Sequence, residues 1–511
     1  MRDFNFNGEE RLPGERGSAA ALTAAIIAVV LAVNVIFYIL AITLGLYIAP
    51  AEGYAIELSG ATDSLFAEAI AEKRKVKITF CYPEDEVKAH ETGSLVYKTA
   101  TDLRDRYPEF IELDFVNIIT KRNDRGELVE LSKYQKDMRG NDTYILKNSV
   151  IFESGRNYRV VTDVASSSGF ASFYTTDTEG YTTSYNGEEI MAAMISWVLH
   201  DEHKTAYLTT AHSEQVAPEF ATMLSAAGYY VDIINLKYTD ILPSDENIGL
   251  LIISNPQSDF EKAAEGSGAR TEIEWLKSYV DNNGGSLYVS LDPYVKSLPV
   301  LEGFLKDYGL ELSVAESDGM TLRNIVKDPE NAITTDGFTL VATHAAGEVS
   351  EAIANKVGEY NDGRVILREA SALTLSGNAK PLLVSSSTSV CETGGGVTAT
   401  GGGFTIAAYS ESEPNFDGER GKIMLIPSIY ASVSDALVTN GYSNKEFLYA
   451  TFEILFGAEG VPYGCTPVLY DSGTLENLTI GTAKIYTALI LMIPVSLAVV
   501  GGVITVRRKN R

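Results

Sequence analysis

The side chains best placed for chemistry follow a series of short apolar strands expected between Lys204 and Pro293. The expected strands cover 206–209, 230–234, 250–253 and 287–291, and amphipathic helices separate them. This alternation indicates parallel β-α-β units in an open, doubly wound sheet, which holds its ligand at the carboxyl ends of the strands. The polar residues at those ends are the candidate ligand or partner contacts: His212, Ser213, Glu214, Asn255, Asp259 and Asp292.

None of these residues completes a recognised catalytic arrangement. Ser213 beside His212 has the composition of a nucleophile and its base, but the G-x-S-x-G turn that would expose the serine is absent. The carboxylates of Glu214 and Asp292 leave open a hydrolase or a carbohydrate-active enzyme. Ordinary loop polarity and helix capping explain the same residues, so we expect no catalytic residue and take His212–Glu214 as a contact turn.

Metal and cofactor sites are not indicated by the sequence. His200 and His203 stand beside carboxylates, but H-E-x-x-H spacing is absent and polar residues are common at a helix end. The Gly-rich run at 394–403 lacks the Gly-Lys-Ser/Thr ending of a phosphate loop. The G-x-G-x-x-G pattern of dinucleotide sites does not follow the first strand of the sheet either. We therefore expect no metal and no cofactor.

The cysteines do not indicate a disulfide framework or a zinc site, because there are only three and they are scattered: Cys81, Cys391 and Cys465. Cys81 ends the first strand of an expected β-α-β unit, with strands at 76–80 and 110–116 around a helix at 94–107. This unit is similar in outline to half of a thioredoxin-like domain. Glu84 replaces the second cysteine of a C-x-x-C pair, so disulfide chemistry is not expected.

The elements that carry these residues divide the chain into successive parts. An amphipathic helix, expected from Glu188 to Leu199, leads into the doubly wound part, and a Ser-, Thr-, Tyr- and Gly-rich stretch precedes it. The expected order is an α/β domain at 52–165, a linker at 166–187, the doubly wound domain at 188–315, a β-rich segment with a closing α/β unit at 316–465, and a connector at 466–484.

Two uncharged stretches, 19–48 and 485–506, are each long enough to cross a bilayer as a helix. Basic residues cluster before the first stretch, at Arg2, Arg11 and Arg16, and directly after the second, at Arg507, Arg508, Lys509 and Arg511. The positive-inside rule therefore predicts cytoplasmic tails at 1–18 and 507–511, with residues of about 52–484 on the external face of the cell membrane. The first stretch is longer than a signal-peptide core, which favours an uncleaved anchor.

The charge balance excludes one class of partner. The chain carries 41 Lys and Arg against 68 Asp and Glu, a formal net charge of −27. Without the two ends, 34 basic and 64 acidic residues leave a net charge of −30 for the external part. So acidic a surface repels a phosphate backbone, and we expect no nucleic acid as partner.

Several stretches resemble those of one known family in their residue types and in their order along the chain. The strand at 204–208 ends in Ala211-His212-Ser213-Glu214, where the family has a Gly-His-Gly-Glu turn, so both glycines are replaced. The runs 251–256 and 283–293 match its core. The run 442–456 matches its closing Gly-Asn-x-x-Phe helix, with Ser443 in place of the glycine. On these residues the chain resembles the GldG-like family, auxiliary components of ABC transport systems of the gliding-motility type.

The resemblance implies a fold and a set of partners rather than a reaction. It implies a flavodoxin-like central domain of the class I glutamine-amidotransferase type without the catalytic cysteine. It also implies an ABC permease and a cytoplasmic ATPase as partners of a non-catalytic external subunit that handles substrate or acts as a scaffold. The alternatives are the extracytoplasmic enzyme named above and a ligand-binding membrane sensor, although the tails are too short to hold an output domain.

Overall fold

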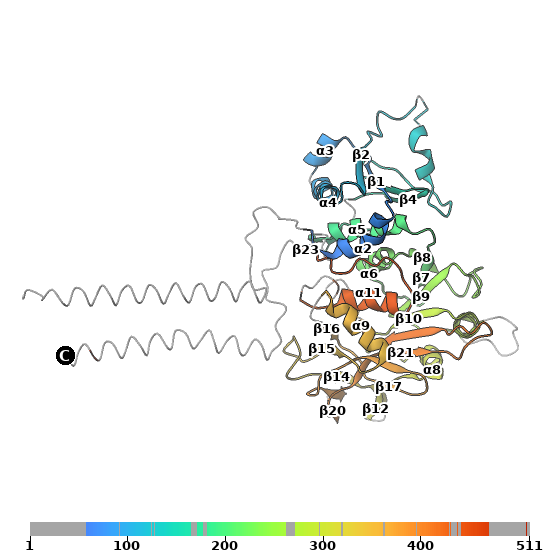
Figure 1. The fold of residues 1–511 in the computed structure, drawn as a ribbon. Coiled ribbons are helices and arrows are strands. Elements are labelled where there is room, and N and C mark those ends of the chain that lie inside the picture. The colour runs from blue at the N-terminus through green and yellow to red at the C-terminus, as the bar shows by residue number, and fades with distance from the viewer. Residues whose placement is uncertain are drawn as a thin grey trace, which may run out of the picture. The chain divides into compact units, whose positions relative to one another are not determined.

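The computed structural model describes residues 58–469 and Arg507, apart from 91, 124, 127, 165–170, 177–180, 262–270, 296, 318–319, 361–362, 395, 429, 431–436 and 438–440. The described residues form a mixed α/β architecture (Figure 1). Both stretches expected to span a membrane, 19–48 and 485–506, lie outside them. Within this described part, every helix is too short or too polar to cross a bilayer.

The first sheet has four strands in the order β2-β1-β3-β4. Its strands are β1 (Val76–Phe80), β2 (Ile111–Phe115), β3 (Val150–Ser154) and β4 (Asn157–Val161). Strands β1 and β2 are parallel, and the chain crosses between them through α3 (Glu84–Ala89) and α4 (Gly93–Arg106). Strand β3 is antiparallel to β1 and forms a hairpin with β4, while η1 (Val129–Gln135) lies between β2 and β3. The β-α-β unit expected from the sequence is confirmed.

The second sheet has nine strands, and five neighbouring ones are parallel in the order β8-β7-β9-β10-β22. These are β7 (Thr205–Thr209), β8 (Tyr230–Ile234), β9 (Ile248–Ser254), β10 (Ser286–Ser290) and β22 (Lys422–Ile426). The helices of this part are α6 (Pro218–Ala226), α7 (Glu272–Lys277), which continues as the π-helical turn η2 (Ser278–Asn282), and α8 (Pro299–Asp307). The strands expected between Lys204 and Pro293 are therefore confirmed.

The other four strands of this sheet are antiparallel and follow β22 in the order β21-β18-β15-β16. They are β21 (Thr405–Glu411), β18 (Lys380–Val384), β15 (Thr339–His344) and β16 (Val365–Arg368). Because β22 pairs with β10, the segments 188–315 and 316–465 share one sheet and one core. Smaller sheets complete the β-rich part: β11 (Leu310–Leu312) with β17 (Leu373–Leu375), β12 (Val314–Ser317) with β13 (Met320–Arg323), and β14 (Ile325–Lys327) with β19 (Val390–Thr393) and β20 (Gly396–Thr400).

The stretch expected to be a linker, 166–187, contains β5 (Tyr174–Thr176) and β6 (Thr182–Tyr185). Strand β6 also pairs with β23 (Val468–Leu469), which places Val468 opposite Tyr185. Sequence pattern alone could not indicate this pairing, because its two strands are short and lie nearly 300 residues apart in the chain. The stretch 166–187 therefore pairs with residues 468–469, close to the end of the continuous described range.

Helix α5 (Gly187–Leu199) is buried on all sides, so the expected amphipathic pattern is wrong for this helix. It contacts α2 (Ala61–Ala71), α4, β3 and β4 of the first sheet region, and it contacts α6 of the second (Figure 1). A helix covered by other elements on every face has no solvent-exposed side to make polar. Its two glutamates, at the first turn, therefore lie in the protein interior.

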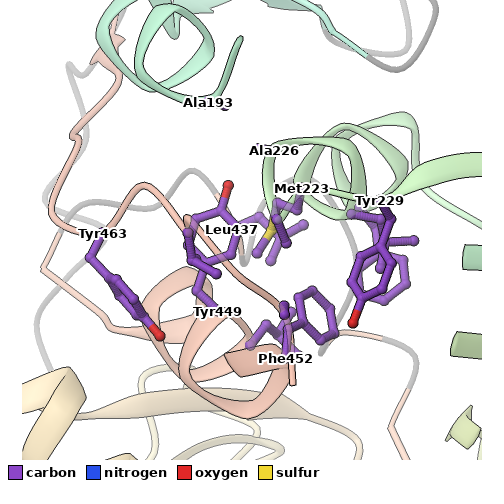
Figure 2. Packing of buried hydrophobic residues seen from close by; sticks show 14 of the residues in the cluster. Ala193, Met223, Ala226, Tyr229, Leu437, Tyr449, Phe452 and Tyr463 are labelled. Carbon is purple, nitrogen blue, oxygen red and sulfur yellow. The ribbon is translucent and has the colours of Figure 1, made fainter. Parts of the chain in front are cut away.

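Beneath α5, the core is continuous between α6 and α11 (Asn444–Ile454), the helix that follows the large sheet. Figure 2 shows Met223 of α6 packed in one cluster with Tyr449 and Phe452 of α11. The rings of Phe220 and Phe452 are 6.0 Å apart, an edge-to-face contact that adds to the area buried. Helix α9 (Glu348–Gly358) packs beside α11.

Gly421, which directly precedes β22, allows a test of how the two halves of the large sheet pack together. A Cβ atom at this position would lie 2.2 Å from the carbonyl oxygen of Val280, so Gly421→Ala forces backbone apart and should destabilise the fold by about 1–3 kcal/mol. Gly358 in α9 has open space around it, so Gly358→Ala should change stability by about 1 kcal/mol or less, in the stabilising direction. Urea unfolding of the two variants measures the difference. Equal midpoints would show that β22 is not packed as described.

Candidate functional site

The candidate site lies where the order of the parallel strands reverses, between β7 and β9. The turns that follow these strands are joined by backbone hydrogen bonds. The amides of Gln257 and Ser258 donate to the carbonyl oxygen of His212, at 2.8 and 3.3 Å, and the amide of Gln215 donates to Ser254, at 2.9 Å. His212, Ser213, Glu214 and Asn255 are thus brought into one pair of turns at the point where such sheets bind ligands.

The side chain of His212 is sealed inside this pair of turns, with 1% of its surface exposed. Its Nε2 lies 2.9 Å from Oε1 of Glu272, and its ring stacks on Phe260 with centroids 4.1 Å apart. Burial alone would raise the pKa of Glu272, but hydrogen bonds from His212 and from the Glu261 amide hold that pKa below its ordinary value. The imidazole of His212 therefore packs in the protein interior, and the contact predicted at the turn 212–214 stays a prediction.

The backbone of the turn is strained. Ala211, Ser213 and Asn255 have φ angles of 103°, 56° and 49°, and they are three of the five non-glycine residues with positive φ in the described part of the chain. Ala211 and Ser213 stand at the two positions where the resembled family has glycine. Residues other than glycine in this region cost about 1–2 kcal/mol each. The chain therefore keeps the backbone path of a glycine turn without the glycines.

Glu214 closes the turn from within. Its Oε2 accepts a hydrogen bond from the His212 amide at 2.8 Å, so a carboxylate of the protein already occupies the donor that an anionic ligand would need. Its Oε1 and the Oδ1 of Asn255 are buried without a hydrogen-bond partner. Asn255 itself is 1% exposed, so it also belongs to the interior rather than to a contact surface.

The remaining two candidates serve neighbouring structure. The Asp259 carboxylate accepts hydrogen bonds from the Val300 and Leu301 amides, at 2.9 and 3.1 Å, and thereby caps the N-terminus of α8. Asp292 accepts from the Tyr294 amide at 2.9 Å and forms a local turn. The structure therefore assigns both carboxylates to capping and turn roles, the alternative that the sequence left open.

A second polar centre, which sequence reasoning missed, lies between the first turns of α5 and α11. The Lys445 ammonium donates to Oε2 of Glu189 at 3.0 Å and to the carbonyl oxygen of Cys465 at 2.6 Å. The Tyr449 hydroxyl donates to Oε1 of Glu189 at 2.6 Å. Burial by itself lowers the pKa of Lys445, but the carboxylates of Glu189 and Glu446 outweigh burial and raise it.

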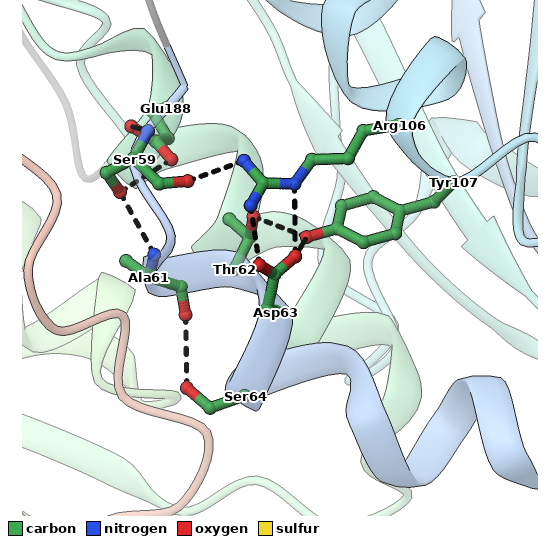
Figure 3. Close-up of polar contacts among 8 residues, drawn as sticks. All are labelled: Ser59, Ala61, Thr62, Asp63, Ser64, Arg106, Tyr107 and Glu188. Atoms are coloured by element: carbon green, nitrogen blue, oxygen red, sulfur yellow. Dashed lines mark hydrogen bonds and ion pairs between the residues drawn. The ribbon is translucent and has the colours of Figure 1, made fainter.

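Glu188, the neighbour of Glu189, holds the other end of the described chain. Its carboxylate accepts from the amide and the hydroxyl of Ser59, at 3.0 and 2.9 Å (Figure 3). Arg106 at the end of α4 donates to the Ser59 carbonyl oxygen at 2.7 Å and pairs with Asp63 of α2. Two adjacent glutamates thus hold residues near 59 directly and residues near 465 through Lys445.

A small cavity of about 30 Å³ borders this centre, lined among others by Asn186, Glu189, Met223 and Lys445. It has room for about one or two water molecules, too little for an organic ligand. We therefore interpret the centre formed by Glu189, Lys445 and Tyr449 as structural, and call it the joint because it connects α5 to α11. The sequence signal that could have found it is a charged pair at the head of each of two apolar helices: Glu188-Glu189 and Lys445-Glu446.

Comparison with known proteins adds little to this picture. No family model matches the chain, and no curated protein does. Among solved structures, the N-terminal domain of mmIFT52 aligns with a TM-score of 0.37 and 14% identity, over 50% of this chain and 99% of that domain. The cytoplasmic protein STM3548 from Salmonella typhimurium aligns with a TM-score of 0.30 and 13% identity, over 49% of this chain and 98% of its own. Scores this low carry no argument about function.

Glycine at the two strained positions should stabilise the protein. Ala211→Gly and Ser213→Gly remove about 1–2 kcal/mol of backbone strain each, and offset it by about 0.5–1 kcal/mol of added freedom in the unfolded chain. We expect each variant to raise the urea midpoint. Ala226→Gly in α6 is the matched control and should lower it, because its backbone is helical. A loss of stability in Ala211→Gly equal to that of the control would contradict the described turn.

Removing one partner of the buried Glu189–Lys445 ion pair should lower the free energy of unfolding, and neutralising both partners should restore part of it. Lys445→Met leaves the Glu189 carboxylate buried without its cation, which should destabilise the protein by about 3–5 kcal/mol. Adding Glu189→Gln removes that charge and keeps an acceptor for Tyr449, so the double variant should be more stable than Lys445→Met alone. Denaturant unfolding of the full-length chain measures both. A double variant no better than the single one would argue that the ion pair is not buried.

Proposed function

We propose that this protein is a non-catalytic auxiliary subunit of an ABC-type transport complex, anchored in the cell membrane at both ends. Residues of about 52–484 lie on the external face, where they handle substrate or act as a scaffold. Its partners are an ABC permease, a cytoplasmic ATPase and the lipid bilayer. The resemblance to the GldG-like family and the two long uncharged stretches support this proposal.

The observation that carries the proposal is the meeting of the two ends of the described chain. We call residues 58–61 the incoming segment and residues 463–469 the outgoing segment. Within the described range 58–469 they are the residues nearest to the two expected spans, and Glu188 and Glu189 hold them at one turn of α5. A methyl group on Gly464 would lie 3.5 Å from Cβ of Ala61. Two connections that leave a domain side by side are what two spans in one membrane require.

The finer fold assignment belongs to the same proposal. The sheet order β2-β1-β3-β4, with a parallel β1-α-β2 unit, supports a thioredoxin-like first domain. The parallel order β8-β7-β9-β10-β22 has the 2-1-3-4-5 pattern of flavodoxin-like sheets, which supports the inactive glutamine-amidotransferase-like assignment. Cys81 is fully buried, and burial raises the pKa of its thiol to about 12, so its environment opposes thiolate chemistry.

The contacts of the strand-end carboxylates favour the non-catalytic role over an extracytoplasmic hydrolase. Glu214 is engaged with the backbone of its own turn, and Asp292 with the amide of Tyr294. A general acid or base must instead reach a substrate proton within hydrogen-bond distance. His212 is buried, so its imidazole cannot assist the carboxylates of Glu214 and Asp292 in acid–base chemistry on a substrate.

Affinity capture of the full-length chain from detergent-solubilised native membranes tests the proposal. We expect a multi-span permease and an ATPase to copurify, identified by mass spectrometry. A variant without residues 58–469 is the control for association through the spans alone, and it should recover less of both partners. Recovery of the full-length chain with neither a permease nor an ATPase would contradict the proposed function.

A further inference from the structure

Two segments of opposite net charge, both with exposed residues, contact each other on this protein. We call residues 117–147 the basic lobe and residues 230–246 the acidic ridge. The basic lobe carries seven Lys and Arg against five Asp and Glu, in a chain whose net charge is −27. The acidic ridge carries four Asp and Glu against one Lys. Its first residues form β8, the edge strand of the large sheet.

Large apolar side chains are exposed on both segments. On the acidic ridge they are Ile233, Tyr238 and Leu242, with Tyr238 83% exposed. On the basic lobe they include Ile119, Val129 and Tyr144, with Tyr144 73% exposed. Single exposed apolar residues need no explanation, but several within one short segment mark an interaction surface.

Arg139 joins the two segments into one surface. Its guanidinium lies 4.0 Å from the ring centroid of Tyr230 and 3.7 Å from the Asp232 carboxylate. Within the basic lobe, Lys121 pairs with Glu130 at 2.8 Å, and the Thr143 amide donates to Gln135, so its described residues form one folded unit. The basic and acidic parts are therefore fixed neighbours.

The edge strand is protected against pairing with another strand. The Ile233 amide donates to the Asp232 side chain at 2.9 Å, and Arg139 covers Tyr230. Such devices block a sheet edge from extending by further strands. The partner of this surface must therefore meet its side chains rather than its backbone.

We propose that this surface binds a second copy of the same chain across a two-fold axis. A two-fold rotation sets the basic lobe of each copy against the acidic ridge of the other, so the charge contact forms twice. The apolar side chains of both segments then cover one another. This inference is independent of the proposed transport role, because it uses only the charge, exposure and contacts of these two segments.

The molar mass of the full-length protein in detergent, measured by light scattering after gel filtration, tests the proposal. We expect the wild-type chain to be a dimer, and Ile233→Ser/Tyr238→Ser/Leu242→Ser to be a monomer with unchanged circular dichroism. Phe416→Ser is the matched control, because Phe416 is fully exposed outside this surface, and it should remain a dimer. A monomeric wild type, or a triple variant that stays dimeric, overturns the proposal.

Charge exchange tests the arrangement without removing apolar contacts. Asp240→Lys/Glu246→Lys reverses part of the acidic ridge, and Arg122→Glu/Arg125→Glu reverses part of the basic lobe. Each variant alone should dimerise more weakly, since like charges then face each other. An equimolar mixture should recover the dimer, because both contacts are again between opposite charges. A mixture no more dimeric than either variant alone overturns the two-fold arrangement.

Discussion

The buried ion pair between Glu189 and Lys445 is the constraint on which the arrangement of this protein depends. It joins the first turns of two helices that are more than 250 residues apart in the chain, and Lys445 extends it to the backbone of Cys465. Charges taken out of water are tolerated only when they are fully paired. Helices α5 and α11 must therefore keep one relative position, and the outgoing segment must stay beside them.

The neighbouring residue, Glu188, fixes the incoming segment in the same way that Glu189 and Lys445 fix the outgoing segment. Glu188 holds Ser59 of the incoming segment, and Arg106 and Asp63 extend the contact to α4 and α2. One turn of α5 thus gathers both ends of the described chain and both sheet regions. In the proposed membrane-anchored subunit, the segments that lead toward both spans would meet at this turn.

Much of the fold could be predicted from local patterns, because the parallel strands after Lys204 and the first β-α-β unit are consecutive in the chain. The single sheet that β22 joins to β10, and the pairing of β6 with β23, could not be predicted, because strand partners distant in the chain leave no local period. The same limit applies to the sites. The sequence places His212 and Asn255 after strands of the sheet, but the burial of His212 depends on Phe260 and Glu272. The contact between Glu189 and Lys445 could not be predicted either, because the two residues are far apart in the sequence and meet only in the fold.

The measurement that tests this account most directly is hydrogen exchange of the incoming and outgoing segments. Peptides covering 58–71 and 463–469 should both exchange faster in Lys445→Met than in the wild-type protein, while peptides from the first sheet, such as 150–161, should keep their protection. Faster exchange in both segments together would show that one joint holds them. Unchanged protection of both segments, or loss in only one, would contradict the claim that the first turn of α5 ties the two ends of the domain.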